Sequence, residues 1–391
     1  MTLYLDAAAS DGVDGSVIEA MVPFLTQAYA NPSSVHTAGK TAARALSAAR
    51  ESIAHDLGAR STEIILTSGG TESDNLAVKG IALARMRNEP SCSPCPRRIL
   101  ISAVEHPAVA ESAQWMHDFF GFDVVRIPVD GQARINLEAL EEEARKGAAL
   151  ACIMLANNEV GTIEPVKESV RICHDAGVPV HIDAVQAAGT IPVDFHDLDA
   201  DTLTASGHKF GAPKGLGILC KRSRVAMEPL ISGGGQGNGL RSGTPNVAGA
   251  VGLAVALREA CERMPTEIPA LAASRDELIG AVLRAVPFAR LTGDPQYRLP
   301  GHASFVFPGI NAEALLVDLD TKGIEVSSGS ACAIGRSEAP GTLLAMGMSV
   351  PEAKSALRFS FRKPLGADDI GSIVAGLRDS LALLHIARTT P

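Results

Sequence analysis

The chain has 391 residues, of which 46% are hydrophobic and 20% are charged, with a net charge of −9 and a pI near 5.6. This balance offers no basic surface for nucleic acid, and no apolar run approaches the ~20 residues that a membrane-spanning helix needs. The amino terminus lacks the pattern of a signal peptide, and seven unevenly spaced cysteines do not suggest a disulfide framework. We therefore expect a cytoplasmic protein with neither a nucleic-acid nor a membrane partner.

The first elements of the chain are a strand and two helices. Residues 3–6 (LYLD) predict a short strand, and Ser16 is expected to cap a helix that runs to about Tyr29. A turn at 31–36 (NPSSVH) separates this helix from a longer, alanine-rich helix that reaches Leu57.

From residue 63 onward, strand patterns alternate with helical patterns. Strands are expected at 63–67, 98–102, 123–127, 149–155, 179–182, 202–205 and 216–220. Helices between them are expected at about 72–88, 107–119, 137–146 and 165–176. This alternation predicts an α/β fold, with a mostly parallel seven-stranded sheet that carries helices on both faces.

The composition changes after Gly211. A glycine-rich run at 233–246 leads into long helices at 247–286. The remaining expected elements are strands at 302–307, 324–327 and 356–361, a helix at 311–321, and a last helix to about Leu384. These elements predict a smaller α+β domain beside the large one, because a chain of this length exceeds what one small core needs.

We predict two domains with the following limits. The large domain covers 15–260, and the small domain is formed by 1–14 together with 261–391. The small domain would carry a cysteine-containing loop at about 327–341, which is rich in glycine and serine and is expected to be mobile.

Two predicted strands end on or near residues that could take part in catalysis. The apolar run 178–182 ends on Asp183, and the run 202–205 leads into a turn that contains Lys209. Carboxyl ends of parallel strands meet at one edge of a sheet, where ligands bind. A lysine there can form a Schiff base and a buried carboxylate can keep a pyridine nitrogen protonated, as pyridoxal 5'-phosphate requires. The alternative is a helix-capping aspartate and a solvent-facing lysine, but the pair, flanked by small residues, favours the cofactor.

The segment 68–72 (SGGTE) follows a strand and opens a helix. Its backbone N–H groups could cradle an anion, with the Thr71 hydroxyl in addition. A capping motif of Thr71 with Asp74 is an equally good interpretation. No P-loop is present, since Ser34 stands where the motif around Lys40 needs its first glycine, and no G-x-G-x-x-G supports a nicotinamide cofactor.

Three further polar positions follow or interrupt apolar strands. His106 could lie flat on an aromatic ring, although a plain histidine near a helix start is an alternative. The amides of Asn157 and Asn158 could bond a small polar ligand or could serve a turn. Arg358 could hold a substrate carboxylate, or it could face water on an edge strand.

The cysteines and histidines give weaker signals. Cys332 lies in a glycine- and serine-rich loop and could act as a nucleophile if its pKa is lowered, although an inert thiol is the plainer interpretation. Cys92 and Cys95 form the one C-x-x-C pair, without the second pair that a zinc site needs. His181 and Asp183 project to one strand face with no further carboxylate, so we expect no metal.

Taken together, these segments resemble a known family. The motifs are SGGTESDN, AVEHPAV, MLANNEVGT, HIDAVQAAG, SGHKFGAPKG, GGGQGNGLRSGT, VSSGSAC and LRFS, in this order. The chain resembles the cysteine desulfurases, in the NifS-like group of the class V aminotransferase family, over nearly its whole length. This resemblance implies a fold type I transferase that depends on pyridoxal 5'-phosphate.

The resemblance also implies roles in cofactor binding. Lys209 would hold the cofactor covalently, Asp183 would pair with its pyridine nitrogen, His106 would stack on the ring, and Gln186 would bond the ring hydroxyl. The phosphate would be bound by Gly70, Thr71, Ser206 and His208, with Thr244 reaching in from the other subunit of a homodimer.

For the reaction, the resemblance implies that Asn158 and Arg358 bind the carboxylate of L-cysteine. Cys332 would attack the substrate sulfur, leaving a persulfide and releasing alanine. The sulfur would pass to an acceptor protein such as an iron–sulfur scaffold, or serve thiolation. The alternatives are a selenocysteine lyase, an aminotransferase or another C–S lyase, and a non-catalytic sulfur-relay subunit.

Overall fold

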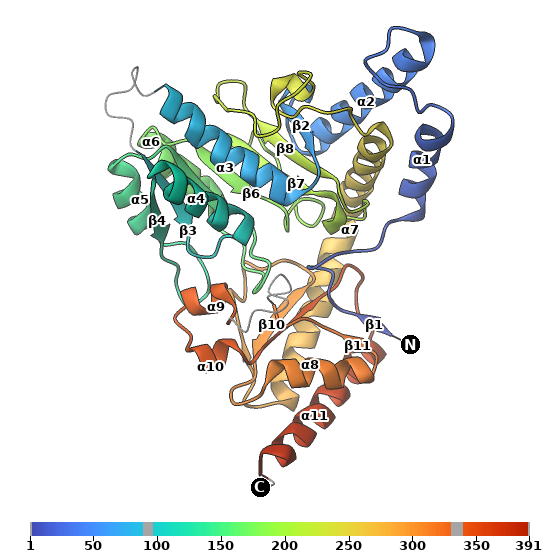
Figure 1. The fold of residues 1–391 in the computed structure, drawn as a ribbon. Helices are drawn as coiled ribbons and strands as arrows, with labels where there is room; N and C mark the ends of the chain where they lie inside the picture. Colours follow the sequence, from blue (N-terminus) through green and yellow to red (C-terminus); the bar gives the residue numbers. More distant parts are fainter. Residues whose placement is uncertain (1, 89–96, 330–338, 390–391) are drawn as a thin grey trace.

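A seven-stranded sheet is the largest feature of the computed structural model, which describes residues 2–88, 97–329 and 339–389 (Figure 1). Its strands are β2 (Ile64–Thr67), β3 (Arg98–Ser102), β4 (Asp123–Ile127), β5 (Leu150–Met154), β6 (Val180–Asp183), β7 (Thr202–Ser206) and β8 (Gly217–Lys221). The spatial order is β2-β8-β7-β6-β5-β3-β4. Strand β8 runs antiparallel to β2 and β7, and the other neighbouring pairs are parallel. The predicted mostly parallel seven-stranded sheet is confirmed, and each strand end lies within one residue of its predicted position.

Helices cover both faces of this sheet. They are α1 (Gly15–Thr26), α2 (Thr37–Asp56), α3 (Gly70–Arg87), α4 (Pro107–Phe120), α5 (Leu137–Arg145), α6 (Val166–Asp175) and α7 (Val247–Ala285). Helices α3 and α4 pack over one face, where Ile99 and Ile101 point. The other face, which includes Leu100 and Ile153, is covered by α2, α5, α6 and α7. Because successive strand residues point to opposite faces, a strand buried on both sides is mostly apolar, as the sequence suggested for β5.

The predicted start of the first helix is wrong. Helix α1 begins at Gly15, so Asp14 and not Ser16 occupies the position before it. The Ser16 hydroxyl instead donates a hydrogen bond to the Glu259 carboxylate on α7, at 2.9 Å. The Ser16 side chain therefore makes a tertiary hydrogen bond and does not form the helix cap that the local sequence had suggested. The helix also ends at Thr26, three residues before the predicted end.

The carboxyl-terminal residues form a second, smaller packing unit, in the lower half of Figure 1. Its elements are β9 (Arg290–Leu291), β10 (His302–Val306), β12 (Ala356–Ser360), α8 (Ala312–Thr321), α9 (Gly341–Ala345), α10 (Val350–Ala353) and α11 (Ala367–Thr389). Strand β10 lies between β12 and β9 and is antiparallel to both. The start of the chain joins this unit, because β1 (Leu3–Tyr4) pairs in parallel with β11 (Ile324–Glu325).

Helix α7 connects the two units. Its early residues, such as Ala250 and Leu257, pack in the core of the large sheet. Its later residues, such as Leu278 and Val282, pack with Phe305 in the second core. The domain limits at residues 14 and 260 stay a prediction. Within the described ranges, none of the helices is long and apolar enough to cross a membrane.

The second core should depend strongly on α7. Leu278 is fully buried there, so Leu278→Ala should lower the free energy of unfolding by about 3 kcal/mol, through lost burial and the cavity left behind. Leu283 lies on the same helix and is 36% exposed, so Leu283→Ala is the matched control and should cost far less. Urea unfolding of the two variants measures the difference; equal losses would contradict this packing.

Glu164 is a carboxylic acid buried below the loop that follows β5. Its side chain is 4% exposed, and its Oε2 accepts a hydrogen bond from the backbone N–H of Ile135, at 2.9 Å. Its own backbone N–H donates to the Leu155 carbonyl, which closes the loop between them. Burial raises the pKa of Glu164 from 4.5 to about 8. The folded protein therefore holds this proton at pH values where the unfolded chain releases it.

This burial predicts a pH dependence of stability. A raised folded pKa means that the stabilisation is complete below pH 4.5 and is lost as the pH rises towards about 8. Glu164→Gln should reduce this loss by on the order of 3 kcal/mol between pH 5 and 8. Chemical unfolding at both pH values tests it, with Glu168→Gln on the exposed side of α6 as the control. An E164Q-to-wild-type difference that does not change with pH would refute the prediction.

Candidate active site

The carboxyl ends of three parallel strands form one edge of the large sheet. In the register of β5, β6 and β7, Met154 lies beside Asp183, and Asp183 lies beside Thr204. Asp183 ends β6, and Ser206 ends β7 immediately before the turn that contains Lys209. The loops that follow these strands thus leave from one edge, which faces the smaller unit (Figure 1).

The amino-terminal segment brings Lys209 and Gln186 to one point. The Lys209 ammonium donates hydrogen bonds to the carbonyl oxygens of Ala8 and Ala9, the latter at 3.0 Å. The Gln186 amide donates to the same Ala8 oxygen, at 2.9 Å. The structure therefore places these two predicted site residues together, through backbone carbonyls that no side-chain motif in the sequence could have indicated.

Asp183 and His106 lie close together at this edge. Asp183 is 4% exposed, and its Oδ1 accepts a hydrogen bond from the Val185 N–H, at 2.9 Å. Burial and, after it, the charge of the Asp74 carboxylate raise its pKa from 3.8 to about 6. His106 caps α4, and its Nδ1 accepts from the Ala108 N–H, at 3.1 Å. His106 thus serves a helix start and also faces the Asp183 carboxyl group.

The expectation of no further carboxylate beside His181 and Asp183 is wrong. Asp74 on α3 lies beside them: carboxylate oxygens of Asp74 and Asp183 and a ring nitrogen of His106 are all within 4.8 Å of one another. Sequence reasoning treated Asp74 only as a capping residue, because 107 residues separate it from its partner His181. The predicted absence of a metal stays a prediction.

The start of α3 packs against the same edge. The helix begins at Gly70 after Gly69, so the predicted alternative in which Thr71 caps it with Asp74 is wrong. A Cβ atom on Gly70 would lie 2.8 Å from the Val185 side chain, so a larger residue here would require that side chain to shift. Thr71 is exposed at the first turn of the helix. The N–H groups of that turn therefore lie beside the carboxyl ends of β6 and β7.

Two polar atoms at the end of β7 and in the turn that follows it are buried without a hydrogen-bond partner in the described part of the chain. They are Ser206 Oγ and His208 Nδ1. Burial and, after it, the charges of Lys209 and Lys214 lower the pKa of His208 to about 4, so its imidazole is neutral at pH 7. Unpartnered polar atoms beside N–H groups of a helix start suit a phosphate group.

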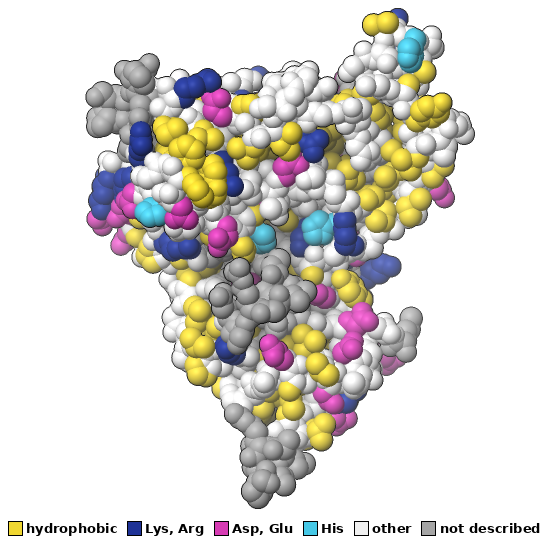
Figure 2. Space-filling view, in the orientation of Figure 1, with side chains coloured by type: hydrophobic (Ala, Val, Ile, Leu, Met, Phe, Trp, Pro, Cys, Tyr) yellow, Lys and Arg dark blue, Asp and Glu magenta, His cyan; other side chains and the backbone are white. Residues whose placement is uncertain are grey.

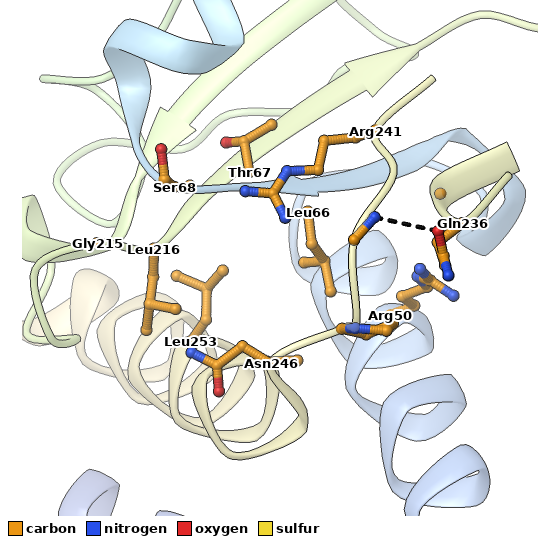
Figure 3. Close-up of a pocket in the computed structure, with 15 residues that line it drawn as sticks. Arg50, Leu66, Thr67, Ser68, Gly215, Leu216, Gln236, Arg241, Asn246 and Leu253 are labelled. Carbon is orange, nitrogen blue, oxygen red and sulfur yellow. Dashed lines mark hydrogen bonds between the residues drawn. The ribbon is translucent and has the colours of Figure 1, made fainter. Parts of the chain in front are cut away.

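A cavity lies on the outer side of the helix start and is lined partly by the glycine-rich run (Figure 3). Ser68, Gln236 and Arg241 line it, and the Gly243 N–H donates to the Gln236 side chain at 3.0 Å. Arg241 also pairs with Glu72 of α3 at 2.9 Å. Thr244 follows in this run and is exposed, where a second subunit could reach it.

Arg358 is buried, which rules out the predicted alternative of an arginine facing water. Its exposed fraction is 2%, and one Nη pairs with Asp6 Oδ1 at 2.6 Å. The other Nη donates to the carbonyl oxygens of Asn158 and Gly329, at 2.8 and 3.2 Å. Its Nε is buried without a partner among the described residues. Three of its five N–H groups make these contacts, so among the described residues the Nε–H and one N–H of the Nη that pairs with Asp6 remain for a ligand.

The two asparagines differ in role. Asn157 is fully buried, and its Oδ1 accepts from the N–H groups of Glu159 and Val160. Its amide also donates to the Thr342 hydroxyl at 3.1 Å. Asn157 therefore serves the turn, as the alternative interpretation proposed. Asn158 is half-buried next to Arg358 and is the one of the pair that can reach a ligand.

The predicted nucleophile Cys332, like Cys92 and Cys95, lies outside the described residues. The two flanks of its segment are described, however. Gly329 is bound by Arg358, and Thr342 is bound by Asn157. The described residues on either side of this segment are therefore hydrogen-bonded to Arg358 and to Asn157.

Comparisons with known proteins agree with this architecture. The aminotransferase class-V family model matches residues 3–371. An IscS-like cysteine desulfurase of Mycobacterium tuberculosis is 43% identical over 91% of this chain and 90% of its own length. The cysteine desulfurase NifS of Azotobacter vinelandii is 38% identical, over 98% and 93%.

Solved structures give the same result. A NifS-like protein superposes with a TM-score of 0.89 and 35% identity, covering 98% of this chain and 100% of its own. The structure of SspA in complex with cysteine superposes with a TM-score of 0.79 and 32% identity, covering 93% and 99%. The predicted fold class is confirmed, and the chain belongs to the aminotransferase class-V family and, within it, to the cysteine desulfurases.

Proposed function

We propose that this protein converts L-cysteine to L-alanine and carries the released sulfur on Cys332. The observation that carries the proposal is that the amino-terminal segment contacts two of the proposed site residues: the Ala8 carbonyl accepts a hydrogen bond from Lys209, which follows the strand next to the one that ends on Asp183, and Asp6 pairs with Arg358 of β12. An amine, a carboxyl group and a guanidinium group are the functional groups that an amino-acid substrate and a pyridoxal cofactor need from the protein.

The residues at this edge fit pyridoxal 5'-phosphate. Lys209 would attach it, Asp183 would hold the proton of its ring nitrogen, His106 would stack on its ring, and Gln186 would bond its hydroxyl. The phosphate would be bound by the Gly70 N–H, Thr71, Ser206 and His208, of which Ser206 Oγ and His208 Nδ1 are buried and unpartnered in the described ranges. When bound, the cofactor supplies an electron sink for the substrate carbon next to the amine.

The protein's own groups would orient the substrate. Arg358 would bind the cysteine carboxylate through its unused Nε and an adjacent Nη, as an arginine fork does. Asn158 lies beside it and would hold the same carboxylate. Burial of Arg358 excludes water from this pair, which strengthens the attraction between the guanidinium and carboxylate groups.

Sulfur transfer would then depend on Cys332. Its thiolate would form an S–S bond with the substrate sulfur while the C–S bond breaks, and the carbon would take up a proton to become alanine. The persulfide sulfur would pass to an acceptor such as an iron–sulfur scaffold protein. We also propose a cytoplasmic location, since unevenly spaced cysteines suit a reducing compartment.

Product analysis tests the reaction. Purified protein loaded with pyridoxal 5'-phosphate should form alanine and sulfide in equal amounts from L-cysteine and a reductant. Cys332→Ser should lower both by roughly 100-fold or more, because the nucleophile is lost. Cys261→Ser is the matched control, since burial raises the pKa of Cys261 to about 11 and it is not a nucleophile at pH 7.

The other outcomes of this assay identify the alternatives. Bound cofactor without sulfide formation, or alanine formation that does not need Cys332, would indicate an aminotransferase or another lyase. A preference for selenocysteine would indicate a selenocysteine lyase. A protein that binds no cofactor under any condition would be a sulfur-relay subunit without this catalysis.

A homodimer is the second part of the proposal, with Thr244 completing the partner's phosphate site. Ile18, Val22 and Leu25 are 51%, 44% and 61% exposed, and they fall on one side of α1 at helical spacing. Tyr29 and Val35 continue this apolar surface, and Figure 2 shows hydrophobic side chains over the same upper right corner. Such a surface is typical of a subunit interface.

Substitution in this surface tests the dimer. Leu25→Asp should place a charge in the interface, shift the mass measured by light scattering towards the monomer, and weaken retention of the cofactor phosphate. Val317→Asp on α8 is the control, because Val317 is 62% exposed on a different part of the molecule. A Leu25→Asp protein that remains dimeric would exclude α1 from the interface.

A further inference from the structure

A buried chain of polar side chains lies directly behind Asp183, and the proposed mechanism does not use it. Asp74 of α3 has its Oδ1 3.2 Å from His181 Nε2, and His181 Nδ1 is 2.9 Å from the Thr202 hydroxyl. The three residues come from α3, β6 and β7, and none is more than 1% exposed.

The chemistry of these contacts fixes the arrangement. A carboxylate can only accept, so His181 must donate from Nε2 to Asp74. The Nδ1 atom of a neutral imidazole can then accept a hydrogen bond from the Thr202 hydroxyl. Burying a carboxylate is costly unless it is hydrogen-bonded, so a chain of this kind, formed from three separate elements, has to be specified by the fold.

The position of Asp74 relates it to the cofactor end of the site. His181 and Asp183 are two residues apart on β6, so they point to the same face of the sheet, and α3 covers that face. Oxygen atoms of Asp74 and Asp183 lie within 4.8 Å of each other. The charge of Asp74 is, after burial, the largest cause of the raised pKa of Asp183.

The other ionisable groups around Asp183 do not supply this negative charge. Glu105 accepts a hydrogen bond from the Met154 N–H, and burial raises its pKa well above its usual value, which favours its neutral form. Burial likewise raises the pKa of the Cys152 thiol on β5. His106 and His181 act in the opposite direction and lower the pKa of Asp183.

We propose that Asp74, held in place by His181 and Thr202, is a positioning residue that keeps the ring nitrogen of pyridoxal 5'-phosphate protonated. It would do so by adding a second negative charge behind the one on Asp183, which favours a proton on the pair formed by Asp183 and the ring nitrogen. This inference rests on the proposed function, because it presumes the cofactor, but it assigns a role to residues that touch neither the cofactor nor the substrate.

The test reads the protonation of the ring nitrogen directly. Wild-type protein and Asp74→Asn are loaded with cofactor labelled with ¹⁵N in the ring, and its NMR shift is followed from pH 6 to pH 10. Asparagine keeps the shape and a hydrogen-bond acceptor but removes the charge. The pH at which the ring nitrogen loses its proton should fall by about one unit, the lower end of what a nearby charge produces. The dissociation constant for the cofactor, measured by equilibrium dialysis, should be higher in Asp74→Asn than in the wild type.

Variants of His181 separate positioning from packing. His181→Leu leaves Asp74 buried without a donor, so Asp74 should take up a proton and the ring-nitrogen titration should fall as in Asp74→Asn. His181→Gln keeps an N–H group near the place of Nε2 and should restore most of the wild-type value. A purely structural role would make both variants less stable without moving the titration.

The chain offers a matched control for removing a buried carboxylate. Asp201 precedes β7, at the opposite end of the strands from Asp183, and its carboxylate is 2.7 Å from His174 Nε2. Asp201→Asn should reduce stability but leave the ring-nitrogen titration unchanged.

The outcomes are distinct. A ring nitrogen in Asp74→Asn that titrates as in the wild type overturns the inference; if that variant does not fold, a wild-type titration in His181→Leu does the same. Failure of the wild-type protein to bind the cofactor would overturn the proposed function itself.

Discussion

The backbone register of three parallel strands is the constraint on which the rest of the site depends. Hydrogen bonds between β5, β6 and β7 set Met154, Asp183 and Thr204 side by side. A slip of one residue along β6 would turn Asp183 and His181 to the opposite face of the sheet, where α6 and the main core lie. It would also break the contact between His181 and Asp74 on α3. The almost complete burial of these strands stabilises the register, since any other pairing would expose apolar side chains and bury unpaired polar ones.

The second constraint is the path of the first ten residues. Strand β1 belongs to the smaller unit, and the chain then crosses to the edge of the large sheet, where the Ala8 carbonyl contacts Lys209 and Gln186. Along this path Asp6 pairs with Arg358, and the Ala8 N–H donates to the Ser360 hydroxyl at 2.9 Å. The same short segment therefore ties β12, which carries the proposed substrate arginine, to the strand end that carries the proposed cofactor lysine. A shift of one unit against the other would therefore disturb these contacts.

The sequence allowed the architecture to be predicted because both periodicities are strong: buried strands read as short apolar runs, and the helices between them as mixed patterns. The edge that joins Asp183 to Lys209 followed from strand polarity alone. The contact of Asp74 with His181 could not be predicted, because it depends on how far α3 shifts along the sheet, and no local pattern encodes that. The Ala8 carbonyl was missed for a different reason, since backbone groups leave no signature in a side-chain motif. The cap predicted at Ser16 failed because a tertiary partner, Glu259, was available to its hydroxyl.

The hydrogen-bond donors at one end of the proposed site and the carboxyl groups at the other would determine the orientation in which a phosphorylated pyridine binds. One end offers hydroxyl groups, the neutral His208 and the N–H groups at the start of α3, all of which suit an anion. The other end offers Asp183 with Asp74 behind it, which suits a cation and repels an anion. A cofactor bound in the reverse direction would place its phosphate against two carboxyl groups and its ring nitrogen against hydrogen-bond donors. Because α3 supplies the N–H groups at its first turn and Asp74 one turn later, a single helix contributes to both ends. The rise of α3 thus sets the spacing between the N–H groups at its first turn and the Asp74 carboxylate.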